Sequence, residues 1–413
     1  MTLEFFYLKK SKLKYVHLNV SNNNMITYRF RIPLRIEEDE WDTEKQRPKN
    51  IYLKKYRKIN SKIDRLKVVL KEHAESMRKK GRPISYKGIN NEIQRICKEK
   101  ESIYSENSLL HFIKLYISGR KEMICHSTYK RYMVFFRLLQ RFEGFMMQNF
   151  LIEDVNSDFV KHFISFGKEE DYSNNTIYRS IHFVKTILNF AERRGIRTYV
   201  REIEVRREKQ HKEIITLTEQ EIVQIKVTEI PEELQPAKDW LLISCYTGQR
   251  ISDFMNFSIE HLTEVNGKTC IGFTQQKTGK EMLLPLHPDV IGVVRRNGGV
   301  FPSPINPHLY NEQIRKIGKL AGLNRIINTG KRIGFRTKHM LIEKWQVLSS
   351  HIGRRSFATN FYGKIPTPLL MEATGHSTEH MFLKYINHKD KERILSLSQH
   401  FERVCEDRMR DIL

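Results

Sequence analysis

A charged stretch with almost no apolar face, Arg201 to Lys212, interrupts this chain near its middle. A segment of this composition does not pack into a hydrophobic core, so it predicts a solvated linker between separately packed regions. The chain of 413 residues is also too long for one ordinary core, which favours two or three domains. We therefore place a boundary at residues 201–213.

The first part of the chain, residues 1–100, has the pattern of a small sheet with a helix. Apolar and polar residues alternate over residues 14–20 and 28–32, with asparagines at 22–24 between them, which predicts a hairpin; residues 3–8 fit a third strand. A helix is expected to follow, capped by Asn60 or Ser61. This basic module either lays its strands in a DNA groove or serves as a solubilising module.

Residues 104–200 have the spacing of a helical bundle. The clearest helices are Thr128 to Phe142, after a cap at Ser127, and Asn175 to Glu192, after a cap at Ser173 or Asn174. Their apolar stripes are expected to form core. The basic residues between the stripes are the candidates for phosphate contact, namely Lys130, Arg131, Arg179 and Lys185.

The last part, residues 214–413, predicts a mainly helical domain with one small sheet, whose hairpin spans Thr269 to Leu286. A final helix is expected from Lys389 to Cys405, within a tail that runs to Leu413. The expected fold class is therefore mainly α and multidomain: a small N-terminal β-sheet and helix, a helical bundle, and a helical domain with a small antiparallel sheet.

The charge of the chain restricts its partners. A formal net charge of +24 and a pI near 9.7 imply a polyanion such as nucleic acid or an anionic membrane. No run of about 18 apolar residues is present and the first residues do not resemble a secretory signal, so we expect a cytoplasmic protein with a nucleic acid as its partner. The five cysteines form no C-x-x-C pair, and no nucleotide-binding motif is complete, so neither metal nor cofactor is expected.

The last part also carries the residue types that break a phosphodiester without a metal: a nucleophile, cations for the non-bridging oxygens and an acid for the leaving oxygen. Arg250 follows Thr247-Gly248-Gln249, where the glycine permits a sharp turn. Lys277 lies at the hairpin tip, where Lys280 is the alternative. His351 and Arg354, three residues apart, are expected on one helical face. His376, in Gly-His-Ser, precedes Tyr385 by a short helix; its i, i+4 spacing with His380 is a weak metal signal, because no carboxylate or cysteine partner is nearby.

These residues, in this order and spacing, resemble the tyrosine recombinase, or phage integrase, family. The resemblance rests on Arg250-Ile251-Ser252-Asp253, His351-x-x-Arg354, Gly375-His376-Ser377 and the tyrosine nine residues after His376. It is strong over residues 214–400, while the helical middle is similar to the family's core-binding domain. The N-terminal module resembles more weakly the arm-binding domain of integrases from mobile elements, especially conjugative transposons of the Bacteroidetes.

The resemblance implies a role for each residue. Tyr385 would attack the scissile phosphate, leaving a 3′-phosphotyrosine and a free 5′-hydroxyl. Arg250 and Arg354 would bind the non-bridging oxygens, and Lys277 would protonate the departing 5′-oxygen. Histidines 351 and 376 would assist by hydrogen bonding or proton transfer. Asp253 would have a supporting role, and Arg355 is a further candidate for DNA contact.

Two other functions stay open at this point: a type IB topoisomerase-like DNA relaxing enzyme, and a non-catalytic DNA-binding accessory factor. For a recombinase the expected partners are double-stranded DNA, further copies of the chain in a homotetramer, and accessory DNA-bending proteins. The tail from Lys389 to Leu413 could pack on its own domain or on a neighbouring subunit. The outcome could be integration and excision of a mobile element or inversion of a DNA segment.

Overall fold

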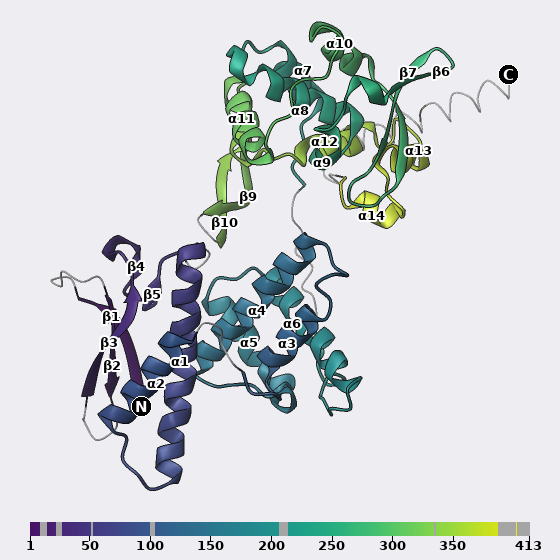
Figure 1. Cartoon of the computed structure of the whole chain (residues 1–413). Helices are drawn as coiled ribbons and strands as arrows, with labels where there is room; N and C mark the ends of the chain where they lie inside the picture. The colour runs from purple at the N-terminus through teal and green to yellow at the C-terminus, as the bar shows by residue number, and fades with distance from the viewer. Residues whose placement is uncertain are drawn as a thin grey trace. The chain divides into compact units, whose positions relative to one another are not determined.

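The computed structural model describes residues 1–8, 15–21, 27–50, 53–99, 104–205, 214–333, 336–386 and 402 (Figure 1). The chain divides into two compact units, Met1–Lys209 with Arg332–Thr337, and Gln210–Lys331 with Lys338–Leu413. Helices predominate, and the sheets are small and antiparallel. The predicted mainly helical, multidomain fold class is therefore confirmed.

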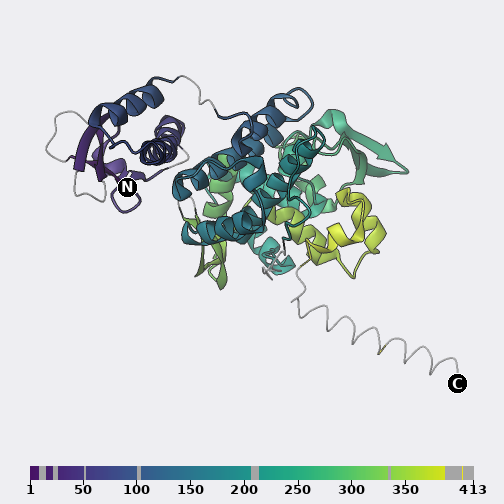
Figure 2. The same ribbon diagram turned by 90° about the horizontal axis from the view of Figure 1, so that it is seen from below.

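The first unit begins with an antiparallel sheet in the order β1-β2-β3. Alternate residues of its strands are buried, among them Phe5, Leu18 and Phe30. Helices α1 and α2 cover this buried face, as the two views agree (Figure 1 and Figure 2). The elements are β1 (Thr2–Tyr7), β2 (Tyr15–Ser21), β3 (Thr27–Arg35), a two-residue pair β4 (Trp41–Asp42) and β5 (Arg47–Pro48), α1 (Lys54–Lys79) and α2 (Tyr86–Lys98). The three predicted strands are confirmed; the asparagines at 22–24 lie outside the described residues.

Helix α1 begins earlier than the sequence suggested. It starts at Lys54, so the predicted caps Asn60 and Ser61 are wrong and both residues lie inside the helix. The reason is that Tyr56 and Ile59 are buried and extend the apolar stripe toward the N-terminus by more than a turn. The Asn60 amide donates to the Tyr56 carbonyl at 3.1 Å, a bond made within the helix rather than at its start.

The bundle of the first unit has a core rich in phenylalanine. It consists of α3 (Leu109–Ser118), α4 (His126–Met146), α5 (Ser157–Glu169) and α6 (Asn174–Glu192). The ring of Phe142 lies within 5.3 Å, centroid to centroid, of four other phenylalanine rings: Phe150, Phe159, Phe163 and Phe166. Ser173 caps α6 as predicted, through the N–H of Thr176. The cap predicted at Ser127 is wrong, because α4 already starts at His126 and has no side-chain cap.

Helices α1 and α4 touch at one close crossing. A Cβ atom on Gly144 would lie 2.7 Å from the Cα of Asp64, so only glycine fits there. The Asp64 carboxylate accepts a hydrogen bond from the Arg47 guanidinium at 2.8 Å, and both side chains are buried. The sheet core and the bundle core of the first unit are therefore joined through α1.

The second unit supports the residues of the predicted active site. Its helices are α7 (Glu219–Val227), α8 (Gln235–Thr247), α9 (Ile251–Phe254), α10 (Pro288–Arg296), α11 (Pro307–Leu320), α12 (Ile352–Phe361), α13 (Thr367–Thr374) and α14 (Glu379–Leu383). A three-stranded sheet contains β6 (Leu262–Val265), β7 (Lys268–Thr274) and β8 (Glu281–Pro285), so the predicted hairpin is confirmed. Helices α8 and α12 pack so closely that a Cβ atom on Gly353 would collide with Ser244.

A second hairpin, β9 (Ile326–Ile333) and β10 (Arg336–Glu343), was not predicted, so the expectation of a single small sheet is wrong. Its apolar residues Ile326 and Leu341 are exposed, so the strands lack the alternation that one buried face imposes. The predicted helix from Lys389 to Cys405 falls outside the described residues, apart from Glu402.

Candidate active site

Arg250 is placed by the turn that ends α8. Gly248 follows the helix with a left-handed φ of 67°, and a Cβ atom there would meet the ring of Phe357 at 2.5 Å. Arg250 comes two residues later, in extended conformation at the start of α9. The turn predicted from Gly248 is therefore confirmed. The position requires glycine for two reasons: its φ angle is left-handed, and the Phe357 ring leaves no space for a Cβ atom.

The Arg250 guanidinium is held by neutral and acidic neighbours. Its Nη1 donates to Oε1 of Gln275 at 3.0 Å and lies 3.9 Å from Oδ2 of Asp253. The other oxygen of Asp253 accepts the backbone N–H of Gln276 at 3.0 Å. Asp253 thus ties α9 to the turn between β7 and β8, which is the turn that carries Lys277.

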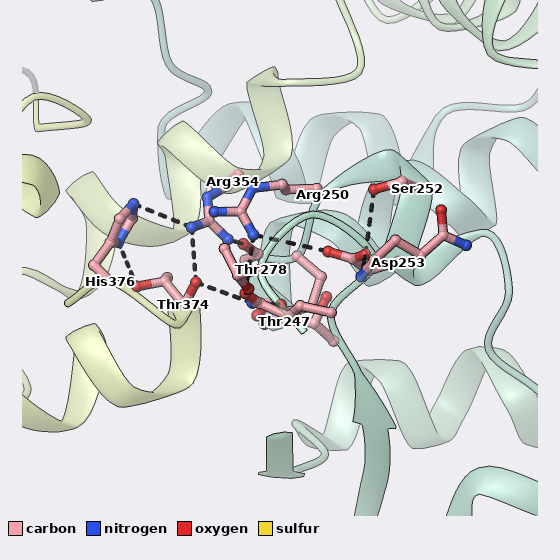
Figure 3. Close-up of polar contacts among 12 residues, drawn as sticks. Thr247, Arg250, Ser252, Asp253, Thr278, Arg354, Thr374 and His376 are labelled. Carbon is pink, nitrogen blue, oxygen red and sulfur yellow. Dashed lines mark hydrogen bonds and ion pairs between the residues drawn. The ribbon is translucent and has the colours of Figure 1, made fainter. Parts of the chain in front are cut away.

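Arg354 is fully buried, although it is a cation. Its Nη1 donates to the carbonyl of Gly248 at 2.9 Å, and its Nη2 donates to the carbonyl of Thr374 at 2.7 Å (Figure 3). Burial is the main cause that lowers the pKa of Arg354, and the charge of Arg250 lowers it further. The two guanidinium groups are therefore close enough to repel each other.

His376 is fixed in one tautomer by Arg354. An arginine nitrogen only donates, so the contact of 3.1 Å between Arg354 Nη2 and His376 Nε2 makes Nε2 an acceptor. The proton then sits on Nδ1, which faces the hydroxyl of Thr374 at 2.8 Å. Burial and the charges of Arg354 and Arg250 lower the pKa of His376 to about 3, so the ring is neutral at pH 7. In this structure His376 orients Arg354.

Tyr385 lies just beyond α14 and reaches the same cluster. Its hydroxyl is 3.3 Å from Nε2 of His351, and its ring lies 5.3 Å from the guanidinium carbon of Arg354 and 4.8 Å from the ring of His376. The side chain is half-buried. A phenol, two histidines and two arginines thus come together within one chain.

His351 is the N-cap of α12, with helical dihedrals, and its carbonyl accepts the backbone N–H of Arg355 at 3.2 Å, so His351 and Arg354 lie on one face of the helix as expected. Both side chains reach Tyr385. Burial lowers the pKa of His351 to about 4, and the charges of Arg355, Arg354, Arg250 and Lys277 add to the effect. His351 is therefore neutral at pH 7.

Lys277 and Lys280 are both exposed in the turn between β7 and β8. The charge of Lys277 contributes to the lowered pKa of His351, so Lys277 lies near the cluster. This favours Lys277 as the lysine that belongs to the cluster. Arg355, next to Arg354, is half-buried, and burial lowers its pKa.

The predicted phosphate-contacting residues of the bundle lie in the other unit. Lys130 and Arg131 are exposed on α4, and Arg179 is exposed on α6. Lys185 is half-buried and donates to the carbonyl of Ile203 at 2.7 Å, so it is already engaged with the protein. Three of the four candidates therefore present their charges to solvent.

One buried residue of the site, Gln275, was missed from the sequence. It lies two positions before Lys277 and accepts the bond from Arg250. Polar residues near hairpin tips are normally solvated, so nothing in Gln275-Gln276-Lys277-Thr278 marked the first glutamine as buried. Only the solvent exposure of each residue in the turn, which the sequence does not give, identifies Gln275 as buried.

The cluster has the electrostatics of an anion-binding site. Four cations gather around two neutral histidines, and among the described residues only Asp253 supplies a nearby negative charge to the pair of arginines. Buried cations without full pairing are costly, and a bound phosphate would offset that cost. Among the described residues no group of three or more His, Cys, Asp or Glu could hold a metal ion, and no helix is long and apolar enough to cross a membrane.

Comparison with known sequences decides the family. The sequence model of the phage integrase SAM-like domain matches residues 108–200, and that of the phage integrase family matches residues 204–392, together well over half of the chain. The chain belongs to the phage integrase family. The integrase is thus a tyrosine-type site-specific recombinase, as the motifs predicted. The narrower resemblance to Bacteroidetes integrases stays a prediction.

Solved structures agree with this fold. Residues 82–397 of the Tn1549 transposon integrase, in complex with circular intermediate DNA, are 16% identical to the integrase with a TM-score of 0.51; the match covers 70% of this chain and 99% of that one. The same residues of the Tn1549 transposon integrase with one arginine-to-lysine substitution, in complex with another circular intermediate DNA, are also 16% identical, with a TM-score of 0.52 over 72% of this chain and 99% of that one. No curated protein matches the integrase.

Proposed function

We propose that the integrase cleaves DNA with Tyr385 as its nucleophile, in cis, within the cluster of the second unit. The observation that carries the proposal is that the Tyr385 hydroxyl lies 3.3 Å from Nε2 of a neutral His351, while the guanidinium carbon of the buried Arg354 lies 5.3 Å from the centroid of the Tyr385 ring. Both partners come from the same chain as the tyrosine. A neutral histidine can accept the phenol proton, and the arginine favours the phenolate and the phosphate.

The proposed step is balanced without a cofactor. The Tyr385 oxygen forms a bond to the scissile phosphorus as the bond to the 5′-oxygen breaks. The phenol proton passes to His351, and Lys277 donates a proton to the departing 5′-oxygen. Arg250 and Arg354 bind the two non-bridging oxygens. The phosphotyrosine retains the bond energy, so a 5′-hydroxyl from another strand can reverse the step.

A nicked suicide substrate tests this proposal. Cleavage near the nick releases a short oligonucleotide and traps the covalent adduct, which a denaturing gel separates from free protein. We expect Tyr385→Phe to form no adduct, while Tyr362→Phe, which removes a hydroxyl elsewhere in the same unit, retains it. An adduct with Tyr385→Phe at the wild-type rate would reject Tyr385 as the nucleophile.

The exposed face of the N-terminal sheet supports a second DNA contact. Arg29 lies 5.4 Å from the ring centroid of Phe6, and Arg31 lies 5.1 Å from that of Tyr15, so cations and aromatic rings alternate on this face. We assign arm-type DNA binding to residues 1–100 and core-site binding to residues 104–200, with residues 201–213 as the linker to the catalytic residues from 214 onward. Loss of DNA binding together with a shallower salt dependence in Arg29→Ala would support the arm-type role.

Exchange between two duplexes requires four cleavages, so we further propose a homotetramer on DNA, acting in the cytoplasm. The fold shared with a transposon integrase favours integration and excision of a mobile element over inversion. The mass of the complex that Tyr385→Phe forms with its DNA site tests the tetramer. A largest complex with two protein copies on one duplex would reject it.

A further inference from the structure

Gln275 is the buried centre of the hydrogen bonds around Arg250. It lies at the start of the turn between β7 and β8 and has no solvent exposure. Its carbonyl oxygen accepts two bonds, from Arg250 Nη1 at 3.0 Å and from the Thr278 hydroxyl at 2.8 Å. One atom thus joins an arginine of the site to the turn that carries Lys277.

The amide nitrogen of Gln275 reaches the opposite side of the cluster. It donates to Oε1 of Gln249 at 3.2 Å and to the carbonyl of Thr374 at 3.3 Å. The Thr374 carbonyl also accepts the bond from Arg354. A Cβ atom on Gly375 would lie 2.6 Å from this nitrogen, so the segment before His376 is pressed against the amide.

The orientation of this amide follows from its neighbours. Arg250 only donates and the Thr374 carbonyl only accepts, so the oxygen must face the arginine and the nitrogen must face the carbonyl. All the bonding capacity of the side chain is in use, with two bonds accepted and two donated. A residue satisfied in this way is held rigidly and holds its partners in turn.

A neutral amide suits this position better than a carboxylate would. A glutamate could accept the bond from Arg250, but it would cancel part of the charge that binds phosphate and would repel the Thr374 carbonyl. Asp253 supplies the nearby negative charge from a longer distance, 3.9 Å. Glutamine therefore orients the guanidinium and leaves its charge available to a ligand.

We propose that Gln275 is a positioning residue, which sets Arg250, the Lys277 turn and the Thr374–His376 segment at fixed distances from one another around the scissile phosphate. This inference rests on the cleavage proposed above. Removal of the amide frees Arg250 from its strongest acceptor, and a displacement of about 1 Å at a reacting centre costs on the order of 100-fold in rate.

The test compares two buried glutamines. Gln275→Met keeps the length of the side chain but removes the amide. Gln249→Met is the matched control: it is equally buried and loses its bonds to the carbonyls of Thr247 and Ala373. It also loses the bond that it accepts from Gln275, but Gln275 keeps its bond to the Thr374 carbonyl and Arg250 keeps its acceptor. Single-turnover cleavage of the suicide substrate, DNA affinity and melting temperature are measured for each. We expect Gln275→Met to cleave about 100-fold more slowly than wild type and at least about 10-fold more slowly than Gln249→Met.

A second substrate separates the arginine from the lysine. When sulfur replaces the bridging 5′-oxygen, a thiolate leaves, and a thiol with a pKa of about 8.5 needs no proton from an acid. This substrate should restore Lys277→Ala to near the wild-type rate but leave Gln275→Met slow, because Arg250 stays displaced. This contrast separates displacement of Arg250 from loss of the acid, while the melting temperature and the comparison with Gln249→Met separate both from loss of stability.

Three outcomes overturn the inference: wild-type cleavage by Gln275→Met, equal defects in the two glutamine variants, or full recovery of Gln275→Met on the sulfur substrate. Failure of the proposed function looks different, because the wild-type protein would then form no adduct through Tyr385. Should Gln275→Met not fold, Thr278→Val tests the same oxygen from the exposed turn. Its defect should be smaller and should vanish on the sulfur substrate, and a defect that persists there rejects the link to the lysine.

Discussion

Replacement of Gly248 by alanine should destabilise the second unit through two separable effects. The left-handed backbone, with φ at 67°, costs a non-glycine residue roughly 1–2 kcal/mol. The new Cβ atom would lie 2.5 Å from the Phe357 ring, and overpacking of this kind adds about 1–3 kcal/mol. Together they predict a loss of about 2–5 kcal/mol in the free energy of unfolding. DNA cleavage should fall too, because the Gly248 carbonyl holds Arg354.

Gly267→Ala provides the matched control. Gly267 has nearly the same backbone angle, 72°, but nothing lies within 4 Å of an added Cβ atom. It should therefore lose only the backbone part, roughly 1–2 kcal/mol. Urea unfolding followed by tryptophan fluorescence, in a Trp41→Phe background, reports on the second unit through Trp240 and Trp345. Equal losses for the two alanines would refute the proposed clash with Phe357.

Three further predictions concern the same unit. Lys277→Ala should reduce adduct formation by on the order of 100-fold or more, as expected for loss of a general acid, whereas Lys280→Ala should stay near wild type; the reverse order in the suicide-substrate assay would exchange their roles. Gly292→Ala, at an exposed position of α10 with open space around it, should raise the free energy of unfolding by about 0.5–1 kcal/mol in urea. The pKa values of His351 and His376 are lowered to about 4 and about 3, below the unfolded value near 6.5, so the unfolded state binds more protons between these limits. The melting temperature should therefore fall as the pH drops from 6.5 toward 4, and less steeply when both histidines are replaced by glutamine; parallel curves would contradict these shifts.

The elements that the sequence predicted well are those with one clearly buried face. The strands of the N-terminal sheet alternate strictly because one face packs on α1 and α2, and the predicted hairpin in the second unit has buried Ile271 and Leu284. Helix starts were harder. Asn60 and Ser127 are good capping residues, yet tertiary packing extends α1 past Asn60, and α4 starts one residue before Ser127. In the hairpin of β9 and β10, Ile326 and Leu341 are exposed while Ile342 is buried, so the apolar residues do not line one face and carry no periodic signal.

The residues of the site were predictable for a different reason. Arg250, Arg354 and Tyr385 have reactive or charged side chains at a recognisable spacing, and the chemistry of a phosphate requires such groups together. Gln275 carries no comparable signal, because a glutamine beside a hairpin tip has many ordinary explanations. Its contacts join parts of the chain up to 99 residues apart, and only the folded structure brings those parts together.

The close crossing of α1 and α4 has a consequence for how DNA could be held. Helix α1 has 26 residues and is therefore roughly 40 Å long, and it contributes to the sheet core while it touches the bundle at Gly144. Two binding surfaces joined by a packed helix are held at a fixed distance from each other. If the sheet and the bundle both bind DNA, binding at one surface raises the effective concentration of DNA at the other. The fixed distance between the two surfaces, and not the length of a flexible linker, then determines this concentration. The separation between the two DNA segments therefore becomes part of what the protein recognises.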